Sequence, residues 1–390
     1  MKVLFFVRDI KAPSVTFIRT QIKLVNELHE VLVVTISHHD SYLYDSIPCV
    51  GIPFQDSYWT NRPMRRLANL DWYFGFFNPI FGKKLRNKVN EFKPDIIHCQ
   101  FGTDATLFLD HFSNQAKIPV FIQFRGYDAS YMYGKKSYLS RLRGFFTKTW
   151  IHPIYVSKNQ FDRTIALGLN PDKMRILYSC TDTEFFEFLP KVRSIEQRDF
   201  KFIQVGRMVE VKGHEFTLLA FKQALNLLAE KGLNATLTFV GEGPLWDFLH
   251  QKACELGLKE YVVFLPNMDH KKVKEMLLEA DFFLHPSVTT EDGRIEGLPN
   301  AVMESLAVGV PVIATQHSGL GELQCPEGAL FLVEEWNVSD LASMMIKLVL
   351  GELVYDLKKS RQWIESRFST HQHIKNLDTF YKDEVRPSYQ

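Results

Sequence analysis

The sequence predicts an α/β protein with two doubly wound, Rossmann-like domains in tandem. Short apolar runs of strand length alternate with helical patterns, which is typical of right-handed βαβ units. The runs are almost continuously apolar, as expected of strands that are buried on both faces of a parallel sheet. A chain of 390 residues is also too long for one ordinary hydrophobic core, so two domains are expected.

The first half of the chain supplies one series of elements. Strands are expected at 2–7, 31–36, 95–99, 119–124, 153–156 and 174–178, and helices at 14–28, 80–92 and 158–167. The polar stretch 191–199 then interrupts the alternation and is the best candidate for an interdomain linker.

The alternation restarts after this stretch. Strands are expected at 201–205, 235–240, 261–265, 282–285, 311–314 and 329–333, and helices at 214–231, 244–256, 270–279, 298–308, 338–350 and roughly 353–385. The expected domains are therefore an N-terminal one over 1–190, a linker over 191–199, a C-terminal one over 200–362, and a C-terminal helix over 363–390 that packs back on the N-terminal domain.

Composition excludes several classes of protein. Lys and Arg number 46 and Asp and Glu 45, a formal net charge of +1, which argues against a dedicated nucleic-acid binder. Five cysteines without a CxxC pair indicate free thiols in a reducing compartment. The N-terminal MKVLFFVRDIK is typical of a core strand rather than a signal peptide, and no apolar run approaches the ~20 residues of a membrane span. We therefore expect a cytoplasmic protein.

Two cations follow the first strand of the second half. Strand 201–205 leads into Gly206-Arg207 and, a few residues later, Lys212. Glycine allows a close backbone turn, and the Arg fork and Lys ammonium are suited to phosphate oxygens. Taken alone, this loop is better interpreted as a solvated basic turn that pairs with neighbouring glutamates.

The next loop of the second half is rich in glycine. Strand 235–240 ends in Gly241-Glu242-Gly243-Pro244, and Pro244 suits the first turn of a helix. Glycines ahead of a helix N-terminus can present backbone amides to an anion. A plain tight turn explains the same residues equally well.

The segment 285–311 carries the strongest signal. Glu296 precedes a short helix, and Glu304 lies about two turns inside it. Helix starts present unpaired N–H groups that favour phosphate, and a carboxylate on an otherwise apolar helix needs partners such as vicinal hydroxyls. The alternatives are a first-turn acid for Glu296 and a salt bridge to Arg207 for Glu304. The residues expected to open the helix are Gly297, Leu298 and Pro299.

Together these pieces fit a sugar nucleotide. Ligands of open α/β sheets bind beyond the carboxyl ends of the strands, which is where all of these residues lie. The diphosphate would contact Arg207, Lys212 and the helix start. The ribose would contact Glu304 and the donor sugar Glu296, and the backbone near Asn267 would serve the base.

These motifs resemble those of the retaining GT-B glycosyltransferases of family 4. The resemblance covers most of the chain and is strongest from 201 to 323. Three further motifs resemble the branch that builds bacterial exopolysaccharides of the colanic-acid or amylovoran kind: Ser14-x-Thr16-Phe17-Ile18, His98-x-x-Phe101-Gly102 and Arg125-Gly126-Tyr127-Asp128.

The resemblance implies a fold and a mechanism. Two Rossmann-like domains would face each other across a cleft, with the nucleoside-diphosphate sugar in the C-terminal domain and a glycan acceptor in the N-terminal one. The leaving phosphate would take the acceptor proton on the same face of the sugar, so the anomeric configuration is retained. Arg207 and Lys212 would stabilise the departing diphosphate as a metal does elsewhere, with Glu296 beside them. Neither a metal nor a cofactor is expected.

The resemblance also assigns the first half and exposes two departures. The residues expected to contact acceptor or sugar are Ser14, Thr16, His98, Arg125 and Asp128. The family's glycine pair after the first strand is missing here, and the family's HG-x-D histidine is replaced by Arg125. An arginine can keep a phosphate or hydroxyl contact but does not act as a base.

Basic and aromatic residues gather in two stretches of the first half, 58–93 and 135–148. Such a surface is typical of a protein that binds an anionic membrane peripherally. An equally good interpretation is a set of core aromatics on helices whose other faces are solvated, and single-stranded nucleic acid is disfavoured.

We therefore expect a retaining, metal-independent hexosyltransferase that acts at the inner face of the membrane. Its donor is expected to be UDP-hexose first and GDP-mannose second, and its acceptor a lipid-linked glycan of bacterial exopolysaccharide or surface polysaccharide biosynthesis. Two alternatives stay open. One is an inactive GT-B subunit that binds nucleotide or another glycosyltransferase, and the other is a nucleotide-sugar epimerase.

Overall fold

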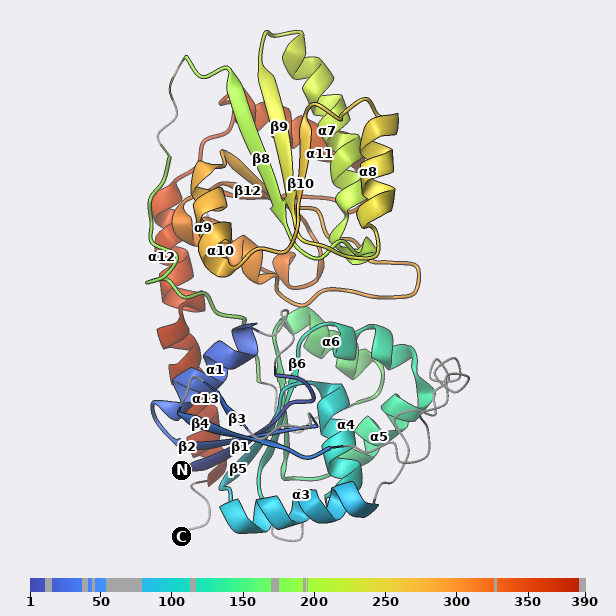
Figure 1. The fold of residues 1–390 in the computed structure, drawn as a ribbon, viewed down its shortest axis with the longest axis vertical. Helices are drawn as coiled ribbons and strands as arrows, with labels where there is room; N and C mark the ends of the chain where they lie inside the picture. The colour runs from blue at the N-terminus through green and yellow to red at the C-terminus, as the bar shows by residue number, and fades with distance from the viewer. Residues whose placement is uncertain are drawn as a thin grey trace. The chain divides into compact units, whose positions relative to one another are not determined.

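The computed structural model describes residues 1–10, 16–36, 41–43, 46–53, 79–112, 117–169, 175–191, 194, 196–325 and 328–385. Its contacts divide the chain into two compact units (Figure 1). Unit 1 comprises Met1–Tyr178 and His373–Gln390, and unit 2 comprises Ser179–Gln372.

Unit 1 contains a 7-stranded sheet in which every neighbouring pair is parallel except β3 and β4. The strands, in sheet order, are β3 (Ser41–Leu43), β4 (Ile47–Gly51), β2 (Glu30–Thr35), β1 (Lys2–Phe6), β5 (Ile96–Cys99), β6 (Val120–Phe124) and β7 (Ile151–Tyr155). The helices are α1 (Thr16–Asn26), α3 (Pro79–Phe92), α4 (Gly102–His111), α5 (Lys136–Phe146), α6 (Lys158–Ala166) and α13 (Thr370–Val385).

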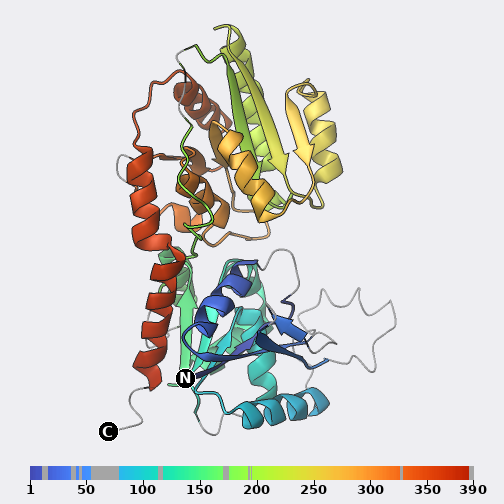
Figure 2. The ribbon, with the colours of Figure 1, turned by 60° about the vertical axis from the view of Figure 1, so that its left-hand side comes forward.

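Helices cover both faces of this sheet because successive side chains of a strand point to opposite sides. On β1, Leu4 and Phe6 pack into one cluster with α3, α4 and α5. Phe5 packs into a second cluster with α1 and α13. Figures 1 and 2 both place α13 beside α1. Tyr381 of α13 is fully buried, so this late helix completes the core of unit 1.

Unit 2 contains a 6-stranded sheet in which all neighbouring pairs are parallel. The strands, in sheet order, are β10 (Val262–Leu265), β9 (Asn234–Val240), β8 (Asp199–Val205), β11 (Phe282–His285), β12 (Val312–Thr315) and β13 (Leu330–Val333). The helices are α7 (His214–Ala229), α8 (Trp246–Glu255), α9 (His270–Glu279), α10 (Asn300–Val308), α11 (Val338–Val349) and α12 (Leu357–Phe368).

The core of unit 2 lies between the sheet and α7, α8 and α11. Figure 1 shows α9, α10 and α12 on the opposite face. Several helices begin where a short polar side chain accepts a backbone N–H bond, such as Asp269 before α9 and Asn337 before α11. Helix α10 begins after Pro299 and has no side-chain cap, so its first N–H groups are not taken up in this way.

The expected α/β class is confirmed, with one parallel sheet and one sheet that is parallel except for the β3–β4 pair, and most expected elements are present. The strand expected at 174–178 is wrong within the described residues, because only Ile176 forms a bridge there, to Tyr155. The short strands β3 and β4 and the helices α4 and α5 were not predicted. The helix expected over 353–385 is two helices, α12 and α13, separated by the extended residue Ser369.

The boundary between the units differs from the expected domain boundary. It follows Tyr178, because later residues already contact unit 2: the Ser179 hydroxyl donates to the Leu298 carbonyl, and the Leu189 N–H donates to the Val308 carbonyl. The expected linker at 191–199 is only partly described, so it stays a prediction.

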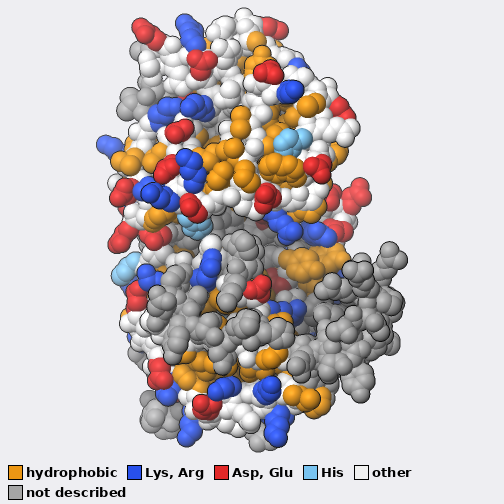
Figure 3. All heavy atoms as spheres, in the orientation of Figure 1, with side chains coloured by type: hydrophobic (Ala, Val, Ile, Leu, Met, Phe, Trp, Pro, Cys, Tyr) orange, Lys and Arg blue, Asp and Glu red, His pale blue; other side chains and the backbone are white. Residues whose placement is uncertain are grey.

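Two features of the described residues concern membranes and metals. None of their helices is both long and apolar enough to cross a bilayer. Nor do they bring three or more His, Cys, Asp or Glu side chains together as a metal site. In Figure 3, basic and acidic side chains are interspersed over unit 2, as a nearly neutral composition leads one to expect.

Candidate functional site

The base of the candidate site is formed by two closely packed loops of unit 2, one after β8 and one after β9. A Cβ atom on Gly241, which has a φ of 140°, would lie 2.2 Å from the Gly206 carbonyl oxygen. A Cβ atom on Gly243 would lie 2.3 Å from the Met208 carbonyl oxygen. Both glycines are therefore required for the two backbones to approach. Gly206 is less constrained, since its nearest neighbour would be a Lys212 methylene at 3.6 Å.

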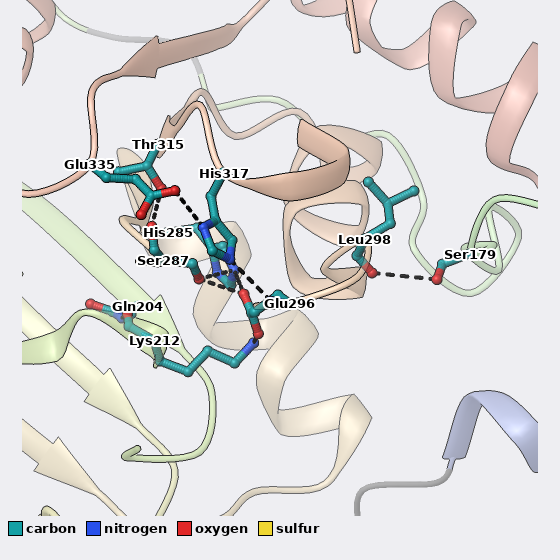
Figure 4. Close-up of polar contacts among 10 residues, drawn as sticks. All are labelled: Ser179, Gln204, Lys212, His285, Ser287, Glu296, Leu298, Thr315, His317 and Glu335. Carbon is teal, nitrogen blue, oxygen red and sulfur yellow. Dashed lines mark hydrogen bonds and ion pairs between the residues drawn. The ribbon is translucent and has the colours of Figure 1, made fainter. Parts of the chain in front are cut away.

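Lys212 and Glu296 form the central ion pair of the site (Figure 4). Lys212 ends the short helix η4 (Glu210–Lys212), and its carbonyl accepts a bond of 2.8 Å from Gln204 on β8. Glu296 lies four residues before α10, and its side chain is only 12% exposed. The two residues follow the neighbouring strands β8 and β11, and their side chains contact each other.

The second oxygen of the Glu296 carboxylate is held by residues at the end of β11. His285 Nε2 lies 2.8 Å from Glu296 Oε2, and the Ser287 hydroxyl donates to the same oxygen at 2.5 Å. Burial acts to raise the pKa of Glu296, but Lys212 and His285 outweigh it and hold that pKa well below its usual range. Burial and the Lys212 charge lower the pKa of His285. Glu296 is therefore an ionised carboxylate.

The backbone of Glu296 is held by a second histidine. The Glu296 N–H donates to His317 Nε2 at 3.1 Å, and His317 Nδ1 lies 2.7 Å from Glu335 Oε1 (Figure 4). Because Nε2 accepts, the ring proton belongs on Nδ1 and is donated to Glu335. Burial tends to raise the pKa of Glu335, but its bonds to His317 and Thr289 lower it overall.

Glu304 lies on α10 as predicted, and its environment is unusual. Its half-buried carboxyl group has neither a hydrogen bond nor an ion pair with any described residue. Burial without a compensating cation raises its pKa to about 7. The salt bridge between Glu304 and Arg207, which the sequence left open, is absent within the described structure. Arg207 is exposed, and its guanidinium pairs with none of the residues described.

The other expected donor residues occupy the same edge of the unit 2 sheet. Asn267, after β10, donates from Nδ2 to Glu242 at 2.7 Å and accepts from the Glu242 N–H at 3.2 Å. The remaining three, Gly297, Leu298 and Pro299, lead from Glu296 into α10, which begins one residue later than the last of them.

In unit 1, Arg125 lies at the end of β6 among three buried glutamines. Its Nη2 group donates to Gln21 at 2.9 Å, Gln100 at 2.6 Å and Gln123 at 2.9 Å. Its guanidinium also lies over the Phe17 ring, 4.6 Å from the ring centroid. Arg125 is thus a firmly positioned cation rather than a loose surface side chain.

Asp128 and His98 take positions inside unit 1. Both oxygens of Asp128 accept backbone N–H bonds, from Gly102 at 2.7 Å and Arg125 at 2.9 Å among others. His98 is fully buried and lies 2.5 Å from the Tyr381 hydroxyl, and burial lowers its pKa to about 3. The sequence predicts that His98 contacts the acceptor or sugar. Its fully buried side chain does not support a direct contact.

Two further expected residues lie at the start of α1. Thr16 is its first residue and accepts from the Thr20 hydroxyl at 3.2 Å through its carbonyl. Ser14 lies outside the described residues.

Sequence reasoning missed Ser287, His317 and Glu335. Each follows a strand of unit 2, namely β11, β12 and β13. The rule that placed Lys212 at the carboxyl end of β8 would also have found them. The hydrogen-bond partner of His285 is the central carboxylate, that of Glu296.

Family comparisons identify the class of protein. A sequence model of the group 1 glycosyl transferases matches residues 185–368, and one of glycosyltransferase family 4 matches residues 15–185. The chain belongs to these glycosyltransferases. The two matches together span both units, and the candidate site lies within the group 1 match.

Curated relatives and a solved structure agree with this assignment. The chain is 30% identical to the amylovoran biosynthesis glycosyltransferase AmsK of Erwinia amylovora over 54% of this chain and 50% of that protein, so it spans half the length of that relative. It is 26% identical to WcaL of Salmonella typhimurium, described as a colanic acid biosynthesis glycosyltransferase, over 88% and 90% of the two chains. The fold matches Anabaena HepE, solved with UDP and glucose, with a TM-score of 0.75, 16% identity and coverage of 97% and 99%. This glycosyltransferase therefore has the GT-B fold.

Proposed function

We propose that this glycosyltransferase transfers a hexose from a nucleoside-diphosphate sugar to a glycan acceptor in bacterial exopolysaccharide or surface polysaccharide biosynthesis. The observation that carries the proposal is the Lys212–Glu296 ion pair, which lies at the same sheet edge as Glu304 and Arg207, two ionisable residues without a described partner. The relatives named for amylovoran and colanic acid biosynthesis support the pathway class.

The charges of the site suit a donor with a diphosphate and two hydroxylated sugars. Arg207 offers a planar donor fork, and Lys212 offers a compact charge, for the diphosphate oxygens. The Glu304 carboxyl, which has no partner among the described residues, would gain hydroxyl partners from the ribose. Glu296, ionised and held by His285 and Ser287, would accept from hydroxyls of the donor sugar.

Retention of configuration follows from the same proposal. The acceptor hydroxyl attacks the anomeric carbon, the bond to the diphosphate breaks, and the departing phosphate oxygen takes the acceptor proton on the same face. Arg207 and Lys212 would stabilise the charge that develops on the leaving group. With two protein cations in this position, the reaction is proposed to proceed without a divalent metal, which a transfer assay with and without EDTA would test.

The donor is proposed to be UDP-hexose, with GDP-mannose second. Similarity of fold to a protein solved with UDP and glucose supports this order. Calorimetry with UDP, GDP and ADP, each alone and as its sugar conjugate, tests it directly. One nucleotide should bind selectively, and Lys212→Ala should abolish that binding while the protein stays folded. Binding of none of them would overturn the donor site, and binding without turnover would favour an inactive partner subunit.

The acceptor is proposed to be lipid-linked, with unit 1 held at an anionic membrane surface. Helices α3 and α5 flank α4 on one face of the unit 1 sheet and carry exposed lysines, among them Lys83, Lys84 and Lys136. Part of the stretch 58–93 lies outside the described residues, and Arg141 of the second stretch pairs with Asp110 at 3.4 Å. Flotation with vesicles tests the proposal: binding should require anionic lipid and weaken in a variant with these three lysines changed to Gln. Equal binding to neutral vesicles would contradict it.

A further inference from the structure

Glu335 holds one loop of unit 2 at its start directly and at its end through His317. The loop comprises residues 289–296, and it connects β11 to the segment that opens α10. At its start, the Thr289 N–H donates to Glu335 Oε2 at 2.6 Å. At its end, the Glu296 N–H donates to His317 Nε2 at 3.1 Å, and His317 donates from Nδ1 to Glu335 Oε1 at 2.7 Å. Oε2 of this carboxylate thus accepts from the start of the loop, and Oε1 accepts from His317 and, at 3.4 Å, from the Thr289 hydroxyl.

We propose that Glu335 and His317 form a clamp that positions Glu296 for the donor sugar. The clamp comprises the side chains of these two residues and the N–H groups of Thr289 and Glu296. Neither clamp residue contacts Lys212, and His317 reaches Glu296 only through its backbone. Both are therefore positioning residues rather than catalytic ones. The inference rests on the proposed function, because it assumes that Glu296 meets the donor.

The contacts explain why a histidine and a carboxylate are needed together. The ring of His317 is buried, so it must receive a hydrogen bond at one nitrogen and donate one at the other. Glu335 takes the donated proton and so fixes the tautomer that leaves Nε2 free to accept from Glu296. Thr315 adds rigidity, because its hydroxyl donates to the carbonyl of Ser287, the residue whose hydroxyl holds the Glu296 carboxylate (Figure 4).

The clamp restricts the Glu296 carboxylate from a second side. Lys212, His285 and Ser287 hold the side chain, and the clamp holds the main chain from which it extends. Misplacement of a reacting group by about 1 Å can cost about 100-fold in rate. Loss of the clamp should therefore reduce transfer more than it reduces binding of the nucleotide moiety, which contacts other residues.

Amide hydrogen exchange tests the clamp without reference to any substrate. In His317→Phe and Glu335→Gln, peptides covering 288–297 should exchange about fivefold faster or more, the effect of losing one hydrogen bond. The Gln variant has a single carbonyl oxygen and cannot accept at both ends. His317→Gln offers an oxygen to the Glu296 N–H and should restore part of the protection at that end. Unchanged exchange in all three variants would overturn the clamp.

A buried hydrogen bond elsewhere in unit 2 provides the matched control. The Ser360 hydroxyl accepts from the Ala329 N–H at 2.7 Å, and Ser360→Ala removes that bond. This variant should lose stability without faster exchange in 288–297. If the clamp did not hold the loop, the His317 variants would also lose stability without faster exchange in 288–297.

Kinetics separate positioning from mere structure. With the preferred donor, His317→Phe should lower kcat about 10- to 100-fold while the affinity for UDP alone stays within about twofold. Faster exchange with unchanged kcat would overturn the positioning role. If the wild-type protein binds no nucleotide but the exchange result holds, the proposed function fails and the loop clamp itself stands.

Discussion

The Lys212 ammonium and the Glu296 carboxylate pair with each other although they follow different strands of the unit 2 sheet. The Glu296 carboxylate thus already pairs with the Lys212 ammonium group, which a donor diphosphate is proposed to contact. Binding of the donor must therefore share or break an existing ion pair, and the carboxylate competes with phosphate for one ammonium group.

This competition leads to a prediction about Glu296→Gln. The variant should bind UDP about three- to tenfold more tightly than the wild type, because Lys212 no longer has a charged partner. Transfer should nevertheless fall, because the sugar loses its carboxylate contact. Calorimetry and initial rates measure the two effects. Glu215→Gln, which removes the partner that lies 3.0 Å from Lys252, is the control and should change neither. Weaker UDP binding by Glu296→Gln would contradict the competition.

Glu304 should make the stability of unit 2 depend on pH. Its pKa is raised to about 7 from an ordinary 4.5, so the folded protein binds this proton more tightly than the unfolded chain does. The stabilisation is complete below pH 4.5 and is lost as the pH rises through about 7. Glu304→Gln should remove that loss, which is at most about 3 kcal/mol. Urea unfolding at pH 5 and pH 8 measures it, and an equal pH dependence in variant and wild type would refute the prediction.

Arg125 should be essential to the core of unit 1 apart from any substrate contact. Arg125→Ala leaves the amide oxygens of Gln21, Gln100 and Gln123 without the guanidinium that they share, at a cost of about 2–4 kcal/mol. The stability of Arg125→Lys should fall between those of the wild type and of Arg125→Ala, because lysine keeps the charge but loses the planar fork. Chemical denaturation gives the values. Arg294→Ala, in an exposed pair with Asp292, should cost under about 1 kcal/mol.

Tyr381 should anchor α13 through its ring more than through its hydroxyl. The hydroxyl lies 2.5 Å from His98 Nδ1, while the ring packs against Phe121 with centroids 5.1 Å apart. Tyr381→Phe should cost about 1–2 kcal/mol, and Tyr381→Ala about 3–5 kcal/mol. Thermal and urea unfolding distinguish them. Equal losses in the two variants would show that the hydroxyl, and not the packing, holds the helix.

The fold was predictable where burial determines composition. Strand β1 is covered on both faces, so it reads as an apolar run. The short strand β3 offers too few residues for a period to show. For the stretch 135–148 the sequence left two interpretations open, a basic surface and a helix with core aromatics, and helix α5 buries Tyr138, Leu142 and Phe146 at helical spacing.

The site was predictable in location but not in its pairings. The ends of parallel strands meet at one edge, so Lys212, Glu296 and Glu304 could be placed together from the sequence. Which charges pair depends on side-chain reach. Lys212 reaches Glu296, whereas Glu304 on the helix reaches no described cation. The replacement of the expected histidine by Arg125 gave no hint of the three glutamines, because they come from α1 and from the ends of two strands.

The position of α13 has a consequence for biosynthesis of the protein. Leu377 and Tyr381 fill the core of unit 1, yet the ribosome translates them only after the whole of unit 2. Unit 1 emerges first but must wait with apolar surface uncovered until that helix arrives, while unit 2 is continuous in sequence and can close as soon as it is released. The earlier-made half of the molecule is therefore the later one to finish folding, and the interval is when chaperones would bind it.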